Sequence, residues 1–206
     1  MFKRILTACT VSALVFLAAC DSPEEKAEAF YQSGLELLAA GDPDRAIVEF
    51  RNVFNYNGEH QDARRQLAEI MRAQGNLSEA FGQYLRLAEQ YPDLADARMA
   101  LAEMAIEGQQ WEEAERHGRR ALELDPAADG ADAVRVSLDF RQASVDRDDI
   151  ALAQLATEAR ALVEANPEDI LSLRVLIAHT MSQNNPAGAL ADICLLYTSP
   201  SPRDRG

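Results

Sequence analysis

The residues of this sequence that are able to carry out acid–base or metal chemistry lie far apart. Its three histidines are His60, His117 and His179. No two of them stand four residues apart, the spacing at which two side chains of one helix share a metal ion. Acidic pairs such as Glu112-Glu113 have the composition of a solvated helix face. The sequence contains no phosphate-binding glycine loop, nucleophile elbow or calcium loop. It therefore predicts a protein that is not an enzyme and uses neither a metal nor a cofactor.

A different chemistry is predicted at Cys20. Residues 1–4 carry two basic side chains, residues 5–19 are uncharged, and Leu17-Ala18-Ala19 precedes Cys20. A basic start, a short apolar run and small residues before a cleavage point are typical of a signal peptide. The segment resembles the bacterial lipobox, which implies that residues 1–19 are removed as a lipoprotein signal peptide and that Cys20 is acylated. A soluble protein cut after Ala19 and an uncleaved anchor are the alternatives.

The lipobox resemblance implies a cell-envelope protein that is lipid-anchored and faces the periplasm. Two or three acyl chains hold a protein stably on a membrane, because each buried CH₂ contributes about 0.8 kcal/mol. Asp21 resembles the inner-membrane retention signal of some Gram-negative sorting systems, so the inner membrane is the preferred location. Residues 20–26 then form an acidic leader.

Residues 194–206 differ in composition from the rest of the chain. They are rich in proline and serine and show no helical periodicity. The stretch LLYTSPSPRD resembles the translation of a sequencing adapter, so we expect residues 194–206 to be a non-native tail and the native protein to continue beyond residue 193. A genuine disordered tail is the alternative.

The chain is acidic, with 34 Asp and Glu against 20 Lys and Arg and a formal net charge of −14. Such a surface repels nucleic acid, so no nucleic-acid partner is expected. Of the three cysteines, Cys9 lies in the signal peptide, Cys194 in the tail and Cys20 at the lipid site. The mature domain is therefore expected to contain no disulfide.

A repeat with a period of 34 residues organises the remainder of the chain. Ala46, Ala80 and Ala114 keep this step, and so do Pro92 and Pro126. Self-similarity at such a period is typical of stacked supersecondary units. Apolar residues at helical spacing predict two antiparallel helices of about 14 residues in each copy, too small to bury their apolar faces alone.

Each copy carries the same pattern of aromatic, small and proline positions. The matching residues are Phe30, Gly34, Ala46, Phe50 and Gly58 in the first copy, Ala68, Ala80, Tyr84, Leu87 and Pro92 in the second, and Ala102, Ala114, Ala121 and Pro126 in the third. This pattern resembles the tetratricopeptide repeat. The resemblance implies an all-α fold, an α-solenoid of stacked antiparallel helix pairs. Its units would be 27–60, 61–94, 95–128, a degenerate 129–169 and a truncated 170–193.

Two positions depart from the pattern. Gly118 stands where the third copy should have an aromatic residue, and we expect Trp111, on the same helix, to fill that space. The fourth copy ends at Pro167, 41 residues after Pro126. The surplus of seven lies either in longer helices or in a longer turn around residues 144–149.

In tetratricopeptide-repeat proteins the first helix of each pair lines the concave side, and the resemblance implies that a protein or peptide partner binds in that groove. The candidate partner-binding residues are Tyr31, Arg65, Glu69, Arg72, Met99 and Glu103. They combine charges with apolar spots. They lack the Lys and Asn set of the repeats that grip a C-terminal carboxylate, so that activity is not inferred.

Together these features predict a membrane-anchored periplasmic scaffold for protein–protein interaction. The plan of lipobox, acidic leader and repeats resembles long bacterial tetratricopeptide lipoproteins, some of which accompany exopolysaccharide and exosortase-type export systems. Two alternatives stay open. One is an outer-membrane or pilus assembly lipoprotein acting as a co-chaperone. The other is the recruiting arm of an enzyme whose catalytic domain follows residue 193.

Overall fold

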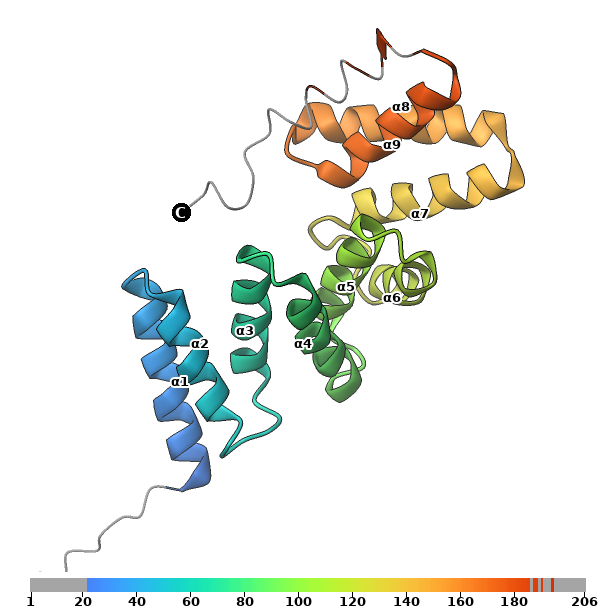
Figure 1. The fold of residues 1–206 in the computed structure, drawn as a ribbon. Helices are drawn as coiled ribbons and strands as arrows, with labels where there is room; N and C mark the ends of the chain where they lie inside the picture. Colours follow the sequence, from blue (N-terminus) through green and yellow to red (C-terminus); the bar gives the residue numbers. More distant parts are fainter. Residues whose placement is uncertain (1–21, 186, 189, 191–193, 195–206) are drawn as a thin grey trace, which may run out of the picture.

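The computed structural model describes residues 22–185, 187, 188, 190 and 194. These residues form nine α-helices and no strand. The helices are α1 (Pro23–Ala39), α2 (Pro43–Val53), α3 (Gln61–Ala73), α4 (Leu77–Gln90), α5 (Ala95–Glu107), α6 (Trp111–Leu124), α7 (Ala131–Asp146), α8 (Asp149–Ala165) and α9 (Ile170–Ser182). Figure 1 shows them following one another in a curved row, from α1 and α2 in blue to α8 and α9 in orange. The predicted all-α class is confirmed.

Each helix packs mainly on its neighbours in the sequence. The helices pair as α1 with α2, α3 with α4, α5 with α6 and α7 with α8, and the second helix of each pair also contacts the first helix of the next. Helix α9 packs on both α7 and α8. Most contacts thus join neighbouring units, as in a solenoid in which each unit is stabilised by the next, and α9 additionally contacts α5. The predicted α-solenoid is therefore confirmed.

Local sequence signals explain where the first helices begin. The Ser22 hydroxyl accepts a hydrogen bond from the Glu25 N–H at 3.1 Å, and the Glu25 carboxylate accepts one from the Ser22 N–H at 2.7 Å. This capping box satisfies two backbone donors that have no partner within the helix. Pro23 and Pro43 begin α1 and α2, where the missing N–H costs no intrahelical bond.

The turns inside the first three pairs need one residue with left-handed backbone. Gly41 and Gly75 supply it with φ angles of 75° and 77°. The third turn differs, because Gly108 has φ −81° and Gln109 takes the left-handed angle at 57°. A side chain makes that conformation less favourable than it is for glycine. The third turn thus places a long polar side chain where the other two have none.

The two helices of a pair meet at small residues. A methyl group added at Gly34 would lie 2.5 Å from Cε1 of Phe50, which is fully buried on α2. Ala46, Ala80, Ala114 and Ala121 are likewise fully buried. Because close-packed interiors cannot absorb an extra methyl group at such distances, these positions fix how closely the helices approach.

The space beside Gly118 is filled from the next unit, and not by Trp111 as we expected. A methyl group at Gly118 would lie 2.8 Å from Leu138 and 3.2 Å from Val134, both on α7. Trp111 begins α6 and is only partly buried. The missing aromatic ring therefore allows α7 to approach α6 closely.

The seven additional residues of the fourth unit lie mostly in its helices. Helices α7 and α8 have 16 and 17 residues, compared with 13 and 14 in α5 and α6. Only Arg147 and Asp148 separate α7 from α8. Of the two alternatives, longer helices are therefore the one observed.

The packing at Gly34 leads to a test with a matched control. Gly34→Ala should lower the free energy of unfolding by about 1–3 kcal/mol, because the new methyl group overlaps the Phe50 ring. Gly82→Ala, within α4, meets no atom within 4 Å. It should raise stability by about 0.5–1 kcal/mol, since alanine loses less backbone entropy in a helix. Urea denaturation measures both, and equal effects would show that the helix crossing is misplaced.

Candidate functional site

Three of the predicted partner-binding residues, Arg65, Arg72 and Glu103, form ion pairs at the surface shared by α3 and α5. Arg65 pairs with Asp62 at 3.2 Å and with Asp96 at 2.9 Å. Arg72 pairs with Glu103 at 2.8 Å, and its second nitrogen lies 3.5 Å from Glu107. The Arg65–Asp62 pair lies within α3, whereas the pairs with Asp96, Glu103 and Glu107 join α3 to α5 and so stabilise the stacking of two units.

The other predicted residues have different surroundings. The Tyr31 ring lies 4.8 Å from the His60 ring and 5.9 Å from the Phe50 ring, measured between centroids. Glu69 is exposed on α3, and partial desolvation raises the pKa of its carboxyl group. Met99 is only 4% exposed and belongs to the core shared by α5 and α7. Glu69 is therefore the most accessible of the six candidates.

Tyr84 lies behind this polar stretch and is buried on α4. Burial raises its pKa to about 12, and the carboxylates of Glu69, Glu103 and Asp96 add to the rise. Burial also raises the pKa of Glu103, although Arg72 opposes that shift. The surroundings of Tyr84 thus favour its neutral phenol over the charged phenolate.

A cavity of about 550 Å³ lies closer to the C-terminal end of the row of helices, where α5, α7 and α9 meet. Its walls come from the last turn of α5, the start of α6, and helices α7 and α9. They include Ile106, Trp111, Phe140, Arg141, Leu171 and Arg174. This volume lies within the usual range of ligand sites. Most of its walls are apolar, and none of the residues that line it is acidic.

Two arginines supply the positive charge of the cavity. The Arg141 guanidinium lies over the Trp111 ring, 5.4 Å from its centroid, a cation–π geometry. Arg174 donates a hydrogen bond from Nη1 to the Glu107 carbonyl oxygen at 2.9 Å, which ties α9 to the end of α5. Neither arginine forms an ion pair with a carboxylate in the part of the chain that the structure describes.

The hydroxyl groups of the cavity wall are already used within α7. Ser137 donates to the Ala133 carbonyl oxygen at 2.8 Å, and Ser144 donates to the Phe140 carbonyl oxygen at 2.7 Å. The side-chain donors that remain for a ligand are the two guanidinium groups, the Gln109 amide and the Trp111 indole N–H. The cavity therefore suits an apolar group that carries a negative charge.

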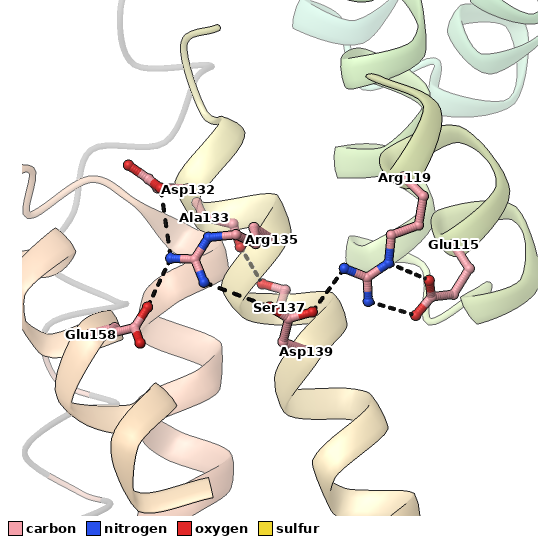
Figure 2. A network of polar contacts seen from close by, with 8 residues as sticks. All are labelled: Glu115, Arg119, Asp132, Ala133, Arg135, Ser137, Asp139 and Glu158. Atoms are coloured by element: carbon pink, nitrogen blue, oxygen red, sulfur yellow. Dashed lines mark hydrogen bonds and ion pairs between the residues drawn. The ribbon is translucent and has the colours of Figure 1, made fainter. Parts of the chain in front are cut away.

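Other arginines of the same region are fully engaged. Figure 2 shows Arg119 on α6 bonded to Glu115 and to Asp139 on α7, and Arg135 between Asp132, Asp139 and Glu158 of α8. This network links three helices through alternating charges. The contrast marks Arg141 and Arg174 as cations that the fold itself does not neutralise.

Sequence reasoning did not find the cavity. One signal was present: neither Arg141 nor Arg174 has an acidic residue three or four positions away, where helical ion pairs form. Arg64 and Arg98 share this property, yet they donate to backbone carbonyl oxygens of Gly58 and Pro92. Spacing alone therefore does not distinguish a ligand-facing arginine from a structural one.

The histidines are not brought together. His60 caps α3 by accepting a hydrogen bond from the Ala63 N–H at 3.2 Å. His117 is 3% exposed, and burial lowers its pKa. No group of three or more His, Cys, Asp or Glu side chains that could hold a metal ion occurs among the described residues.

Some predictions fall outside the described residues. Cys20, Asp21, the signal peptide and nearly all of the segment 194–206 belong there. Of the described helices, none has the length and hydropathy needed to cross a membrane.

The fold and the first-helix surface define an interaction solenoid, and comparison with known proteins identifies its family. Residues 37–93 and 82–129 each match a family model of the tetratricopeptide repeat. The chain belongs to the tetratricopeptide-repeat family. No curated protein sequence matches it significantly.

Solved structures share the fold. The solved chain of MamA from Desulfovibrio magneticus RS-1, which runs from residue 41 to the end, aligns with a TM-score of 0.60 at 14% identity, covering 84% of this chain and 93% of that chain. YrrB, described as a tetratricopeptide-repeat protein with an unusual peptide-binding site, aligns with a TM-score of 0.57 at 14% identity, covering 82% and 84%. The pilF protein of Pseudomonas aeruginosa aligns with a TM-score of 0.54 at 17% identity, covering 87% and 78%. At these identities the likeness shows the fold alone.

The raised pKa of Tyr84 predicts a specific loss of stability in alkali. The folded state holds the neutral phenol, so this contribution is complete below the ordinary pKa of 10.0 and is lost as the pH rises toward about 12. Between pH 8 and pH 11 the wild type should lose roughly 1.4 kcal/mol more than Tyr84→Phe. Urea denaturation at both pH values measures the difference, and parallel losses would show that Tyr84 is not desolvated.

Proposed function

We propose that this chain is a scaffold that binds protein partners along the face formed by its first helices, α3, α5, α7 and α9. The cavity between α5, α7 and α9 is the observation that carries the proposal, because it combines an apolar wall with two cations that the fold leaves unneutralised. Membership of the tetratricopeptide-repeat family supports protein or peptide partners. Catalysis is not part of the proposal.

We propose further that the scaffold is anchored in the cell envelope through an acylated Cys20 and faces the periplasm. The support is the basic start, the uncharged run and the small residues before Cys20. Asp21 favours the inner membrane. Export of an exopolysaccharide is the preferred context, since the plan of leader and repeats resembles lipoproteins of such systems.

The anchor is tested by labelling cells with a palmitate analogue. Wild type should incorporate the label and Cys20→Ser should not, because the thioether needs the cysteine sulfur. Cys9→Ser is the matched control, since Cys9 lies in the predicted signal peptide. It should label like the wild type. Equal labelling of wild type and Cys20→Ser would remove the lipoprotein assignment.

The scaffold role is tested with a photo-reactive amino acid placed at single positions in the cells that produce the protein. Glu69 on α3 and Ala178 on α9 sample the first-helix face, and the exposed Arg86 and Glu89 on α4 sample the opposite side. Irradiation should give protein adducts of defined mass from the first two positions only. Adducts of equal yield from α4 would contradict binding on the first-helix face.

A further inference from the structure

We propose that the cavity between α5, α7 and α9 binds a protein segment in which a large apolar side chain lies next to an aspartate or glutamate. This inference rests on the proposed scaffold function and specifies the chemistry of the partner. It concerns a part of the surface that contains none of the six partner-binding residues predicted from the sequence.

The charge of the cavity argues for an acidic ligand. The chain carries a net charge of −14, but the cavity is lined by two arginines and no carboxylate. A local positive site in an acidic surface attracts the acidic part of a ligand and repels basic ones. This cavity therefore disfavours the basic partners that the overall charge of the chain would otherwise favour.

The two guanidinium groups are positioned in different ways. A cation–π contact with Trp111 restrains Arg141, which makes no hydrogen bond or ion pair within the described residues. Arg174 uses one nitrogen on the Glu107 carbonyl oxygen, which leaves its other donors available. A guanidinium that is already oriented binds a carboxylate through two parallel hydrogen bonds at a smaller entropic cost.

The walls argue for an apolar side chain beside that carboxylate. Ile106, Leu171 and Val175 are buried beneath the cavity, while Phe140 and Trp111 are partly buried at its sides. Met181 at the rim is 62% exposed, and methionine adapts to side chains of different shape. A volume of about 550 Å³ accommodates one large side chain and its neighbours.

A protein segment fits this arrangement better than a fatty acid. The cations come from two helices, and Arg141 lies at the exposed rim. An extended chain presents an apolar group inward and carboxylates to either side, whereas a fatty acid has one carboxylate. Because the Ser137 and Ser144 hydroxyls already donate within α7, they are not available as donors to the hydroxyl groups of a sugar.

The chain provides its own probe, because Trp111 is its single tryptophan and lies in the cavity. We would titrate the full chain with the peptide Gly-Glu-Phe-Glu-Gly and record the tryptophan fluorescence. Three comparison ligands are Gly-Gln-Phe-Gln-Gly, Gly-Glu-Ala-Glu-Gly and laurate. The acidic phenylalanine peptide should change the fluorescence saturably, with a Kd that rises with salt. Both altered peptides should bind at least tenfold more weakly.

Three substitutions test whether the acidic peptide binds at the arginines of the cavity. Arg141→Gln and Arg174→Gln should each raise the Kd for the acidic peptide about 10- to 100-fold, the loss expected for a hydrogen bond to a charged group. Arg160→Gln, an exposed arginine of α8 outside the cavity, makes the same change of charge and should alter the Kd less than twofold. If Arg174→Gln unfolds because it releases α9 from α5, Arg141→Gln still decides, since Arg141 is exposed.

Several results would overturn the inference: equal binding of the acidic and amide peptides, binding of laurate but no peptide, or equal effects of Arg141→Gln and Arg160→Gln. Self-association by sedimentation that Arg141→Gln abolishes would assign the cavity to a second copy, and would also overturn it. If Ala178 gives photo-crosslinks to a protein but the acidic peptide does not bind, the scaffold function is retained and only the proposed ligand chemistry is rejected. Loss of the crosslinks would reject the scaffold function itself.

Discussion

The structure depends on the close crossing of two short helices at small residues. A pair of helices with 13 and 14 residues, such as α5 and α6, has too little apolar surface to fold alone. Fully buried alanines such as Ala46, Ala80 and Ala114 let the helices of each pair approach closely. The remaining apolar surface is then buried by the next pair. Helix α5 shows this most clearly, because residues around most of its circumference are buried, apart from the face that carries Asp96, Glu103 and Glu107.

The cavity follows from a departure from that regular stacking. Helix α7 is three residues longer than α5, and Gly118 admits Val134 and Leu138 into the place of an aromatic ring. The N-terminal half of α7, which carries Val134 and Leu138, therefore packs closely on α6. The additional length of α7 relative to α5 allows its C-terminal turns to reach beyond this contact. Arg141 and Ser144, on its last two turns, form part of the rim. The degenerate fourth repeat thus contributes part of the cavity wall.

The sequence was sufficient to predict the helix pairs, because a period of 34 residues leaves the apolar faces only one consistent register. It was also sufficient to place Gly34 at a crossing. It did not predict that Arg65 and Arg72 would pair across to α5, since ion pairs between units depend on how far one pair is rotated against the next. The cavity was missed for the same reason: Trp111, Arg141 and Arg174 are 30 or more residues apart in the sequence. Their proximity arises only from the packing of α9 on α5 and α7.

Hydrogen exchange of the native protein tests the central claim, that each helix pair is stabilised by its neighbours, most directly. Helices α5 and α6, which have a packed unit on both sides, should exchange most slowly by global unfolding. Helix α1, which packs chiefly on α2, should exchange faster through local opening. Equal protection of every helix pair, independent of its place in the row, would contradict the account.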